Sequence, residues 1–245
     1  MIVWESFQHP CETFLSNMKV SANRRTGDKV QFTSWKSLSD PSVGSFSSSL
    51  NVVNVPEVFV WNETRPYWRS GPWNGKIFIG IPKMKPVYLN GFRLGGDGEG
   101  TYTITLTPVN DSRHPMLVLN SQGKLVFTVW GNKKDEQIIR WTIQQSECDV
   151  YGLCGEFGIC NSQRSPLCSC LRGFEPMDKE EWNRQNWTSG CVRTTPVQCG
   201  RMRNGGESGK EDGFLKFKMV KLPDFAEWSI AEEDQCRTQC LKNCS

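Results

Sequence analysis

The stretch CDVYGLCGEFGICNSQRSPLCSC, residues 148–170, holds five of the eleven cysteines in this 245-residue chain. Clustered cysteines serve as metal ligands, as catalytic thiols or as disulfides. Disulfides persist in exported proteins, whereas cytosolic cysteine clusters more often bind metal or take part in catalysis. The chemistry of this stretch therefore decides the compartment, and with it most of the function.

The spacing disfavours a metal site. Zinc sites usually use repeated C-x2-C pairs, often with histidine. Here five, five, seven and one residues separate successive cysteines, and the chain has only two histidines, His9 and His114. A catalytic thiol at Cys11 beside His9 is conceivable, but adjacent residues seldom reach base–nucleophile geometry. We expect instead that the disulfide partner of Cys11 is missing upstream, which fits the odd cysteine count.

The run C-x-C-x-x-G-F, formed by Cys168, Cys170, Gly173 and Phe174, is typical of EGF-like modules. Six cysteines allow 15 pairings, so the residues alone leave the connectivity open. The resemblance to an EGF-like module implies the pairs Cys148–Cys160, Cys154–Cys168 and Cys170–Cys191.

Four N-x-S/T sequons, which accept N-linked glycans in secreted proteins, indicate the same compartment. They lie at Asn62, Asn110, Asn186 and Asn243. Together with the dense cysteines, they predict an exported chain whose clustered cysteines form disulfide bonds.

Charge and hydropathy argue against nucleic acid and membrane lipid as direct partners of this chain. The 29 basic and 26 acidic residues are mixed, and no basic run exceeds two residues, so nucleic acid is not an expected partner. No apolar run approaches the ~20 residues of a membrane span. The first residues, MIVWESFQHPCE, have neither the basic nor the apolar region of a secretory signal.

No cofactor or metal is expected. The run GPWNGK (residues 71–76) imitates a phosphate loop but has one residue too few, and we interpret it as a turn between strands. The run GGDGEG lacks dinucleotide-loop spacing. Before Cys148 only Glu147 is a strong calcium ligand.

The 22 Gly and 13 Pro, together with short alternating runs, predict a mainly β fold. TYTITLT (101–107) and KLVFTVW (124–130) are expected strands, with a hairpin turn at 121–123. We expect a loop at 91–100, a linker at 200–213, and a strand beginning at Phe214 that exposes Lys216, Lys218 and Lys221. A helix after residue 229 would place Cys236, Cys240 and Cys244 on one face. Three aromatic residues are candidates for a sugar or peptide site, although strand aromatics are more often core: Trp68, Trp73 and Trp141.

Longer motifs resemble the plant S-domain family, which comprises S-locus glycoproteins and G-type lectin receptor-like kinases. The carrying motifs, in order, are WESFQHPCETFLSNMKV (4–20), YWRSGPWNGKIFIGIP (67–82), CDVYGLCGEFGIC (148–160), CSCLRGFEP (168–176), SGCVRTTPVQC (189–199), DGFLKFKMVKLPD (212–224) and CLKNC (240–244). Together they span essentially the whole chain.

The resemblance implies a modular extracellular protein: a β-prism-like lectin domain, a disulfide-rich EGF-like module and a truncated PAN/apple module. The implied boundaries are the end of a bulb-type lectin domain at 1–24, an S-locus glycoprotein domain at 25–145, the EGF-like module at 146–192, and a linker with the PAN/apple domain at 193–245. A pairing of Cys199 with Cys244 would leave Cys236 and Cys240 without partners.

The function that the resemblance implies is ligand binding or receptor dimerisation by the ectodomain of a receptor-like kinase, without chemistry of its own. Expected partners are a peptide, protein or carbohydrate ligand, as in recognition of pollen, and a receptor homodimer or heterodimer. Membrane attachment is expected only through other parts of the parent protein, because its signal peptide, membrane helix and kinase domain are absent from this sequence. The alternatives are a secreted glycoprotein acting without a kinase, or a non-functional truncated gene product.

Overall fold

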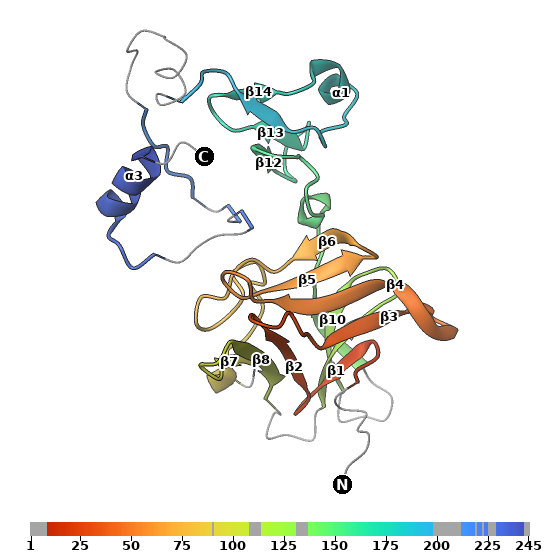
Figure 1. Ribbon diagram of the computed structural model, residues 1–245. Coiled ribbons are helices and arrows are strands. Elements are labelled where there is room, and N and C mark those ends of the chain that lie inside the picture. The colour runs from red at the N-terminus through yellow and green to blue at the C-terminus, as the bar shows by residue number, and fades with distance from the viewer. Residues whose placement is uncertain are drawn as a thin grey trace. The chain divides into compact units, whose positions relative to one another are not determined.

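The computed structural model describes residues 9–89, 91–107, 114–130, 137–197, 212–218, 220–221, 223–224 and 229–242. The chain divides into two units (Figure 1). The first unit contains residues 1–145 together with 221–227, and the second contains residues 146–220 together with 228–245.

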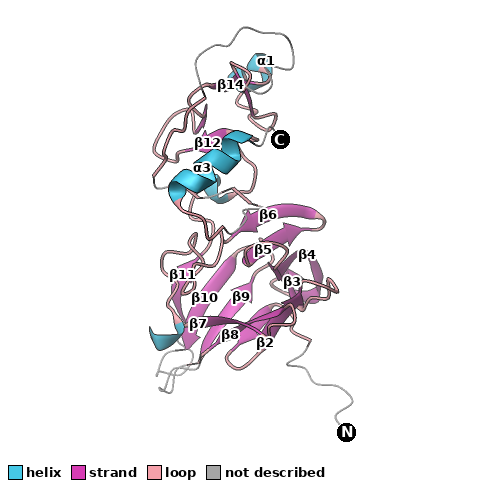
Figure 2. Ribbon diagram, turned by 60° about the vertical axis from the view of Figure 1, so that its left-hand side comes forward, coloured by secondary structure: helices cyan, strands magenta, loops and turns pink. Residues whose placement is uncertain are grey.

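Alternating residues of the first unit form three antiparallel sheets (Figure 2). One sheet has the order β3 (Gln31–Ser37), β4 (Asp40–Asn51), β5 (Glu57–Asn62), β6 (Arg65–Arg69). The second has the order β2 (Lys19–Asn23), β8 (Thr101–Leu106), β7 (Phe92–Gly96). The third has the order β1 (Thr13–Leu15), β9 (Pro115–Leu119), β10 (Leu125–Trp130), β11 (Gln137–Thr142). A short 3₁₀ helix, η2 (Val87–Leu89), precedes β7.

All three sheets contribute side chains to one apolar core. Phe14 of β1, Trp68 of β6 and Leu106 of β8 are each only 1% exposed and belong to the same buried cluster. Three sheets that bury their inner faces against one another are what a prism-like domain requires. The mainly β fold predicted from the sequence is confirmed.

The predicted hairpin turn between β9 and β10 is confirmed. Asn120 Oδ1 accepts hydrogen bonds from the backbone amides of Gln122 (3.0 Å) and Lys124 (2.9 Å). Gly123 adopts a left-handed conformation with φ of +76°, and a Cβ atom there would lie 2.5 Å from the ring of Phe46. Glycine is therefore required for both the turn and the packing beneath it.

The expectation of a loop at 91–100 is wrong. Residues Phe92–Gly96 form β7, which pairs with β8 along its whole length, and only residues 97–100 make the turn between them. Glycine-rich composition concealed the alternation of Phe92, which belongs to the buried apolar cluster, and Leu94, which packs against that cluster. The ladder with β8 and the burial of Phe92 outweigh the weak strand preference of glycine.

The expectation of a strand starting at Phe214 is also wrong. The described residues 212–218 have no regular secondary structure, and Phe214 and Phe217 are 48% and 43% exposed. Alternation alone cannot form a strand without a neighbouring strand to complete its hydrogen bonds. Lys216, Lys218 and Lys221 are all exposed, as expected, and Lys221 also donates a hydrogen bond to the carbonyl of Arg69 at 2.7 Å. Residues 200–211 of the expected linker lie outside the described residues.

A buried ion pair links β5 to β6. Glu57 is 4% exposed, and its Oε2 lies 3.3 Å from Nη1 of Arg69. Burial raises the pKa of Glu57 because it disfavours the charged carboxylate, and the neighbouring Arg69 partly opposes that rise.

The second unit consists of short elements. Two ribbons are formed by β12 (Gly158–Cys160) with β13 (Cys168–Cys170) and by β14 (Phe174–Pro176) with β15 (Cys191–Arg193). The helical segments are η3 (Glu147–Asp149), α1 (Lys179–Asn183) and α3 (Glu233–Lys242). The predicted C-terminal helix is confirmed as α3, which carries Cys236 and Cys240, while Cys244 lies outside the described residues.

The close approach beneath Gly123 can be tested against a matched glycine. Gly98 has nearly the same φ, +78°, but a Cβ atom added there would have nothing within 4 Å. We expect Gly98→Ala to lower the free energy of unfolding by about 1 kcal/mol through backbone strain. Gly123→Ala should cost about 2–4 kcal/mol, because overpacking against Phe46 adds to that strain. Urea unfolding followed by tryptophan fluorescence gives both values, and equal losses would contradict the packing described here.

Candidate ligand-binding pocket

A cavity of about 570 Å³ opens in the first unit beside β7, β10 and β11. Its volume lies within the range of roughly 300–1,000 Å³ that is usual for small-molecule pockets. Six of its lining side chains are apolar: Leu89, Phe92, Pro115, Phe127, Val129 and Trp141. Three are basic: Lys83, Lys85 and Arg140.

Three aromatic rings form one wall of this pocket. The rings of Phe127 and Trp141 are stacked, with centroids 5.2 Å apart and an interplanar angle of 21°. Phe92 contacts both of them, at centroid distances of 5.6 Å to Phe127 and 6.3 Å to Trp141. Because Phe92 is 2% exposed and Trp141 is 7% exposed, their positions are fixed by the core behind them.

A β-bulge places two consecutive residues of β11 at the pocket. Phe127 of β10 pairs with Trp141, but the next residue, Thr128, pairs with Ile139, so Arg140 has no partner in the ladder. Consecutive residues of a regular strand point to opposite faces, whereas a bulge redirects side chains. Arg140 and Trp141 therefore both line the cavity, and one strand supplies a cation and an aromatic ring.

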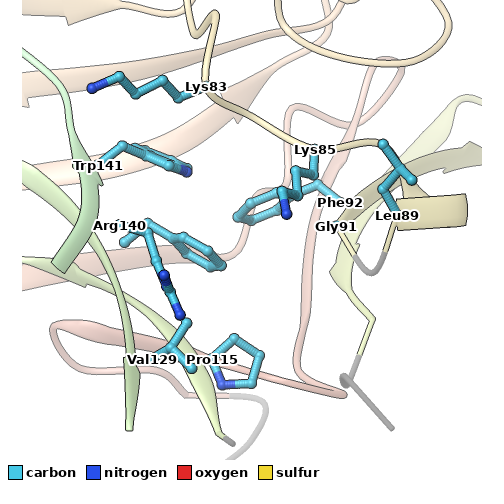
Figure 3. A pocket seen from close by; sticks show the side chains of 10 residues that line it. Lys83, Lys85, Leu89, Gly91, Phe92, Pro115, Val129, Arg140 and Trp141 are labelled. Carbon is cyan, nitrogen blue, oxygen red and sulfur yellow. The ribbon is translucent and has the colours of Figure 1, made fainter. Parts of the chain in front are cut away.

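The basic side chains surround the aromatic wall. Figure 3 shows Lys83 and Arg140 on the side of Trp141 and Lys85 beside Phe92. All three basic residues are exposed, and none of the described residues that line the cavity is acidic. A concave site lined by cations attracts anions and holds them near its apolar wall.

Only one of the three aromatic candidates from the sequence lines this cavity. Trp68 is 1% exposed and belongs to the core, and Trp73 packs edge-on against the buried ring of Phe78 at 5.0 Å. Trp141 lines the pocket. The sequence did not single out the three basic lining residues, Lys83, Lys85 and Arg140, because isolated lysines and arginines are typical of any solvated surface. The bulge that redirects Arg140 also leaves no recognisable pattern in the sequence.

The run GPWNGK forms a turn, as the sequence predicted, but an isolated bridge between Trp73 and Phe78 flanks it rather than two strands. Asn74 Oδ1 accepts hydrogen bonds from the amides of Lys76 (3.0 Å) and Ile77 (2.9 Å). The side chain thus closes the turn upon its own backbone.

In the second unit, disulfides join Cys148 to Cys160, Cys154 to Cys168 and Cys170 to Cys191. The sulfurs of Cys154, Cys160 and Cys168 lie within 4.8 Å of one another, but a metal would need thiolates, and these sulfurs are all in disulfides. Cys199 and Cys244 lie outside the described residues.

The apolar cluster of the second unit is small. Its buried members are Cys154, Cys168 and Trp187, with a few half-buried side chains around them. An apolar cluster of this size cannot offset the entropy of an ordered chain, so covalent links supply much of the stability.

Three cysteines of the described part of the chain carry free thiols: Cys11, Cys236 and Cys240. Cys11 and Cys240 are exposed. The Sγ atom of Cys236 lies 3.6 Å from the carbonyl oxygen of Ala231.

Two of the four sequons lie within the described residues. Asn62 is exposed at the turn between β5 and β6, and Asn186 is exposed after α1. The hydroxyl of Thr188 donates to Asn186 Oδ1 at 2.8 Å. Asn110 and Asn243 lie outside the described residues.

The dependence of the second unit on its disulfides can be tested by removing one of them. The double variant Cys154→Ser/Cys168→Ser reopens a loop with a sequence separation of 14, which should cost about 3 kcal/mol. Trypsin should then cut after Arg164 and Arg172 about tenfold faster or more, because the open form is more populated. Cys11→Ser, which removes a free thiol, is the matched control, and equal cleavage of both variants would contradict a stabilising role.

Glycan attachment at the exposed sequons is a separate prediction. When the chain is secreted from eukaryotic cells, each of the substitutions Asn62→Gln and Asn186→Gln should abolish one N-linked glycan, which peptide N-glycosidase releases from the unsubstituted chain. Mass spectrometry of the tryptic peptides measures the occupancy. Unmodified asparagine at both positions would contradict the prediction.

Three protein families match parts of the chain. The S-locus glycoprotein domain matches residues 68–178, the D-mannose binding lectin family matches residues 1–36, and the PAN-like domain matches residues 199–245. Within the described residues, no helix has the length and apolar character needed to cross a membrane.

The similar curated proteins are named as receptor kinases of Arabidopsis thaliana. Two G-type lectin S-receptor-like serine/threonine-protein kinases are 42% and 41% identical over 248 residues, covering 100% and 99% of this chain. The relative named SD1-13 is 37% identical over 246 residues. The chain spans about 30% of the length of these relatives, and none of the matching families is a kinase domain. The chain therefore combines regions that match the D-mannose binding lectin, S-locus glycoprotein and PAN-like families, and it is similar along its whole length to G-type lectin S-receptor-like kinases.

Proposed function

We propose that this chain is the extracellular recognition segment of a plant S-domain receptor-like kinase, and that it binds a ligand in the pocket beside β7, β10 and β11. The observation that carries the proposal is the pocket itself, in which exposed cations surround an aromatic wall held rigid by the core. Convergent charged groups over an apolar cavity are the usual form of a binding site.

An extracellular location is supported by the covalent structure. The three disulfides of the second unit need an oxidising compartment to form and persist. The similarity to proteins named as S-receptor-like kinases supports a role in reception, and any kinase activity would belong to other parts of the whole protein. Dimerisation through this segment is part of the proposal.

The pocket supports recognition rather than chemistry. Its charged lining side chains are two lysines and one arginine, and the described lining residues include neither a nucleophile with an adjacent base nor a pair of carboxylates. Such a site can bind and orient a ligand through charge and stacking.

Binding can be tested by thermal unfolding of the oxidised, secreted chain against three classes of compound: mannose oligosaccharides, short peptides and small organic anions. A ligand at 100 times its dissociation constant should stabilise the first unit by about 2.7 kcal/mol, which corresponds to about 5–10 °C in Tm. A saturable shift with any class supports recognition. If no class shifts Tm while circular dichroism shows a folded protein, the proposed function is wrong.

A further inference from the structure

We propose that the pocket selects a small aromatic anion, in which a carboxylate or sulfonate is joined to a planar ring system. This inference rests on the proposed function, because it names the ligand class of the same pocket. It follows from three features of the pocket. The first is the positive charge of its rim, by which we mean Lys83, Lys85 and Arg140. The others are the aromatic wall with the bulge beside it, and the lack of hydrogen-bond acceptors among the lining side chains.

The positive charge of the rim favours an anionic ligand. No salt bridge among the described residues pairs Lys83, Lys85 or Arg140 with an acidic side chain. Three cations around one cavity repel one another, and an anion between them offsets that repulsion. Arg140 can hold a carboxylate or sulfonate through two parallel hydrogen bonds.

The aromatic wall favours a ligand that contains a planar ring. Phe92, Phe127 and Trp141 line the cavity together, and planar groups pack against such clusters in offset or edge-to-face arrangements. The bulge at Arg140 keeps the cation next to Trp141, so the charged group and the ring of one ligand can be bound together.

The lining disfavours a neutral sugar. Sugar hydroxyl groups donate as well as accept hydrogen bonds, and carboxylate, amide and hydroxyl oxygens are the side-chain groups that accept from such donors. Among the described residues, no Asp, Glu, Asn, Gln, Ser, Thr or Tyr lines this cavity, and its cationic side chains only donate. A volume of about 570 Å³ accommodates a molecule of one or two fused rings with substituents.

A matched pair of fluorescent probes tests this inference. The anion 1-anilinonaphthalene-8-sulfonate and the neutral N-phenyl-1-naphthylamine share their ring systems and differ in the sulfonate. Fluorescence titration of the oxidised chain should give about tenfold tighter binding of the anion, and about 0.5 M salt should reduce that preference.

Variants then locate the probe. Lys85→Gln and Arg140→Gln should each weaken the anion about fivefold and leave the neutral probe within about twofold. Leu89→Gln, at a lining residue that is 53% exposed, should weaken both probes. Lys76→Gln removes the same charge from an exposed turn that does not line the cavity, and it should change neither affinity.

Any of four results would overturn the inference. Equal affinity for the two probes would show that charge is not selected, and anion binding that survives both cation variants would place the probe on another surface. If the anion does not bind while an oligosaccharide or peptide raises Tm, the ligand class is wrong and the proposed function stands. If nothing binds, both are wrong.

Discussion

Phe92 is buried where β7 of one sheet faces β10 and β11 of another, and its ring touches both Phe127 and Trp141. This contact joins two of the three sheets of the first unit and forms the wall of the pocket. Rings that are part of a close-packed core cannot move aside, so the cavity keeps its shape without a ligand. The rim is built differently, from exposed side chains of a turn and a bulge, and it can change its charge without disturbing the core.

The two units depend on different sources of stability. The first buries a cluster of large apolar side chains from three sheets, and hydrophobic burial can sustain a domain of that size. The second has short ribbons and a cluster centred on Trp187, so its order depends on three disulfides. Recognition in the first unit is therefore expected to be less sensitive to reduction than the fold of the second.

The mainly β class, the hairpin at Gly123 and the helix that carries Cys236 were all predictable from the sequence, because each depends on local periodicity or turn chemistry. The strand β7 was missed, because glycines hide a strand whose partner is β8. The strand expected at Phe214 does not form within the described residues 212–218, where the alternating residues pair with no described strand. Strand formation depends on long-range pairing, which local pattern does not reveal.

The pocket was less predictable than the fold. Trp141 was a candidate because tryptophan is common in binding sites, but nothing in the sequence separated it from Trp68, which is core. The role of Arg140 comes from a two-against-one pairing of β11 with β10, and the roles of Lys83 and Lys85 come from a turn folded beside that bulge. These residues are far apart in the sequence, so only the tertiary structure brings them together.

Hydrogen exchange measured by mass spectrometry, with and without saturating 1-anilinonaphthalene-8-sulfonate, tests most directly whether this pocket is the recognition site. We predict slower exchange in peptides covering residues 83–92 and 137–142, and unchanged exchange in the hairpin of β3 and β4. That hairpin exposes Leu38 and Val43 and is the obvious competing apolar surface. Protection confined to the hairpin, or found only in the second unit, would contradict recognition in this pocket.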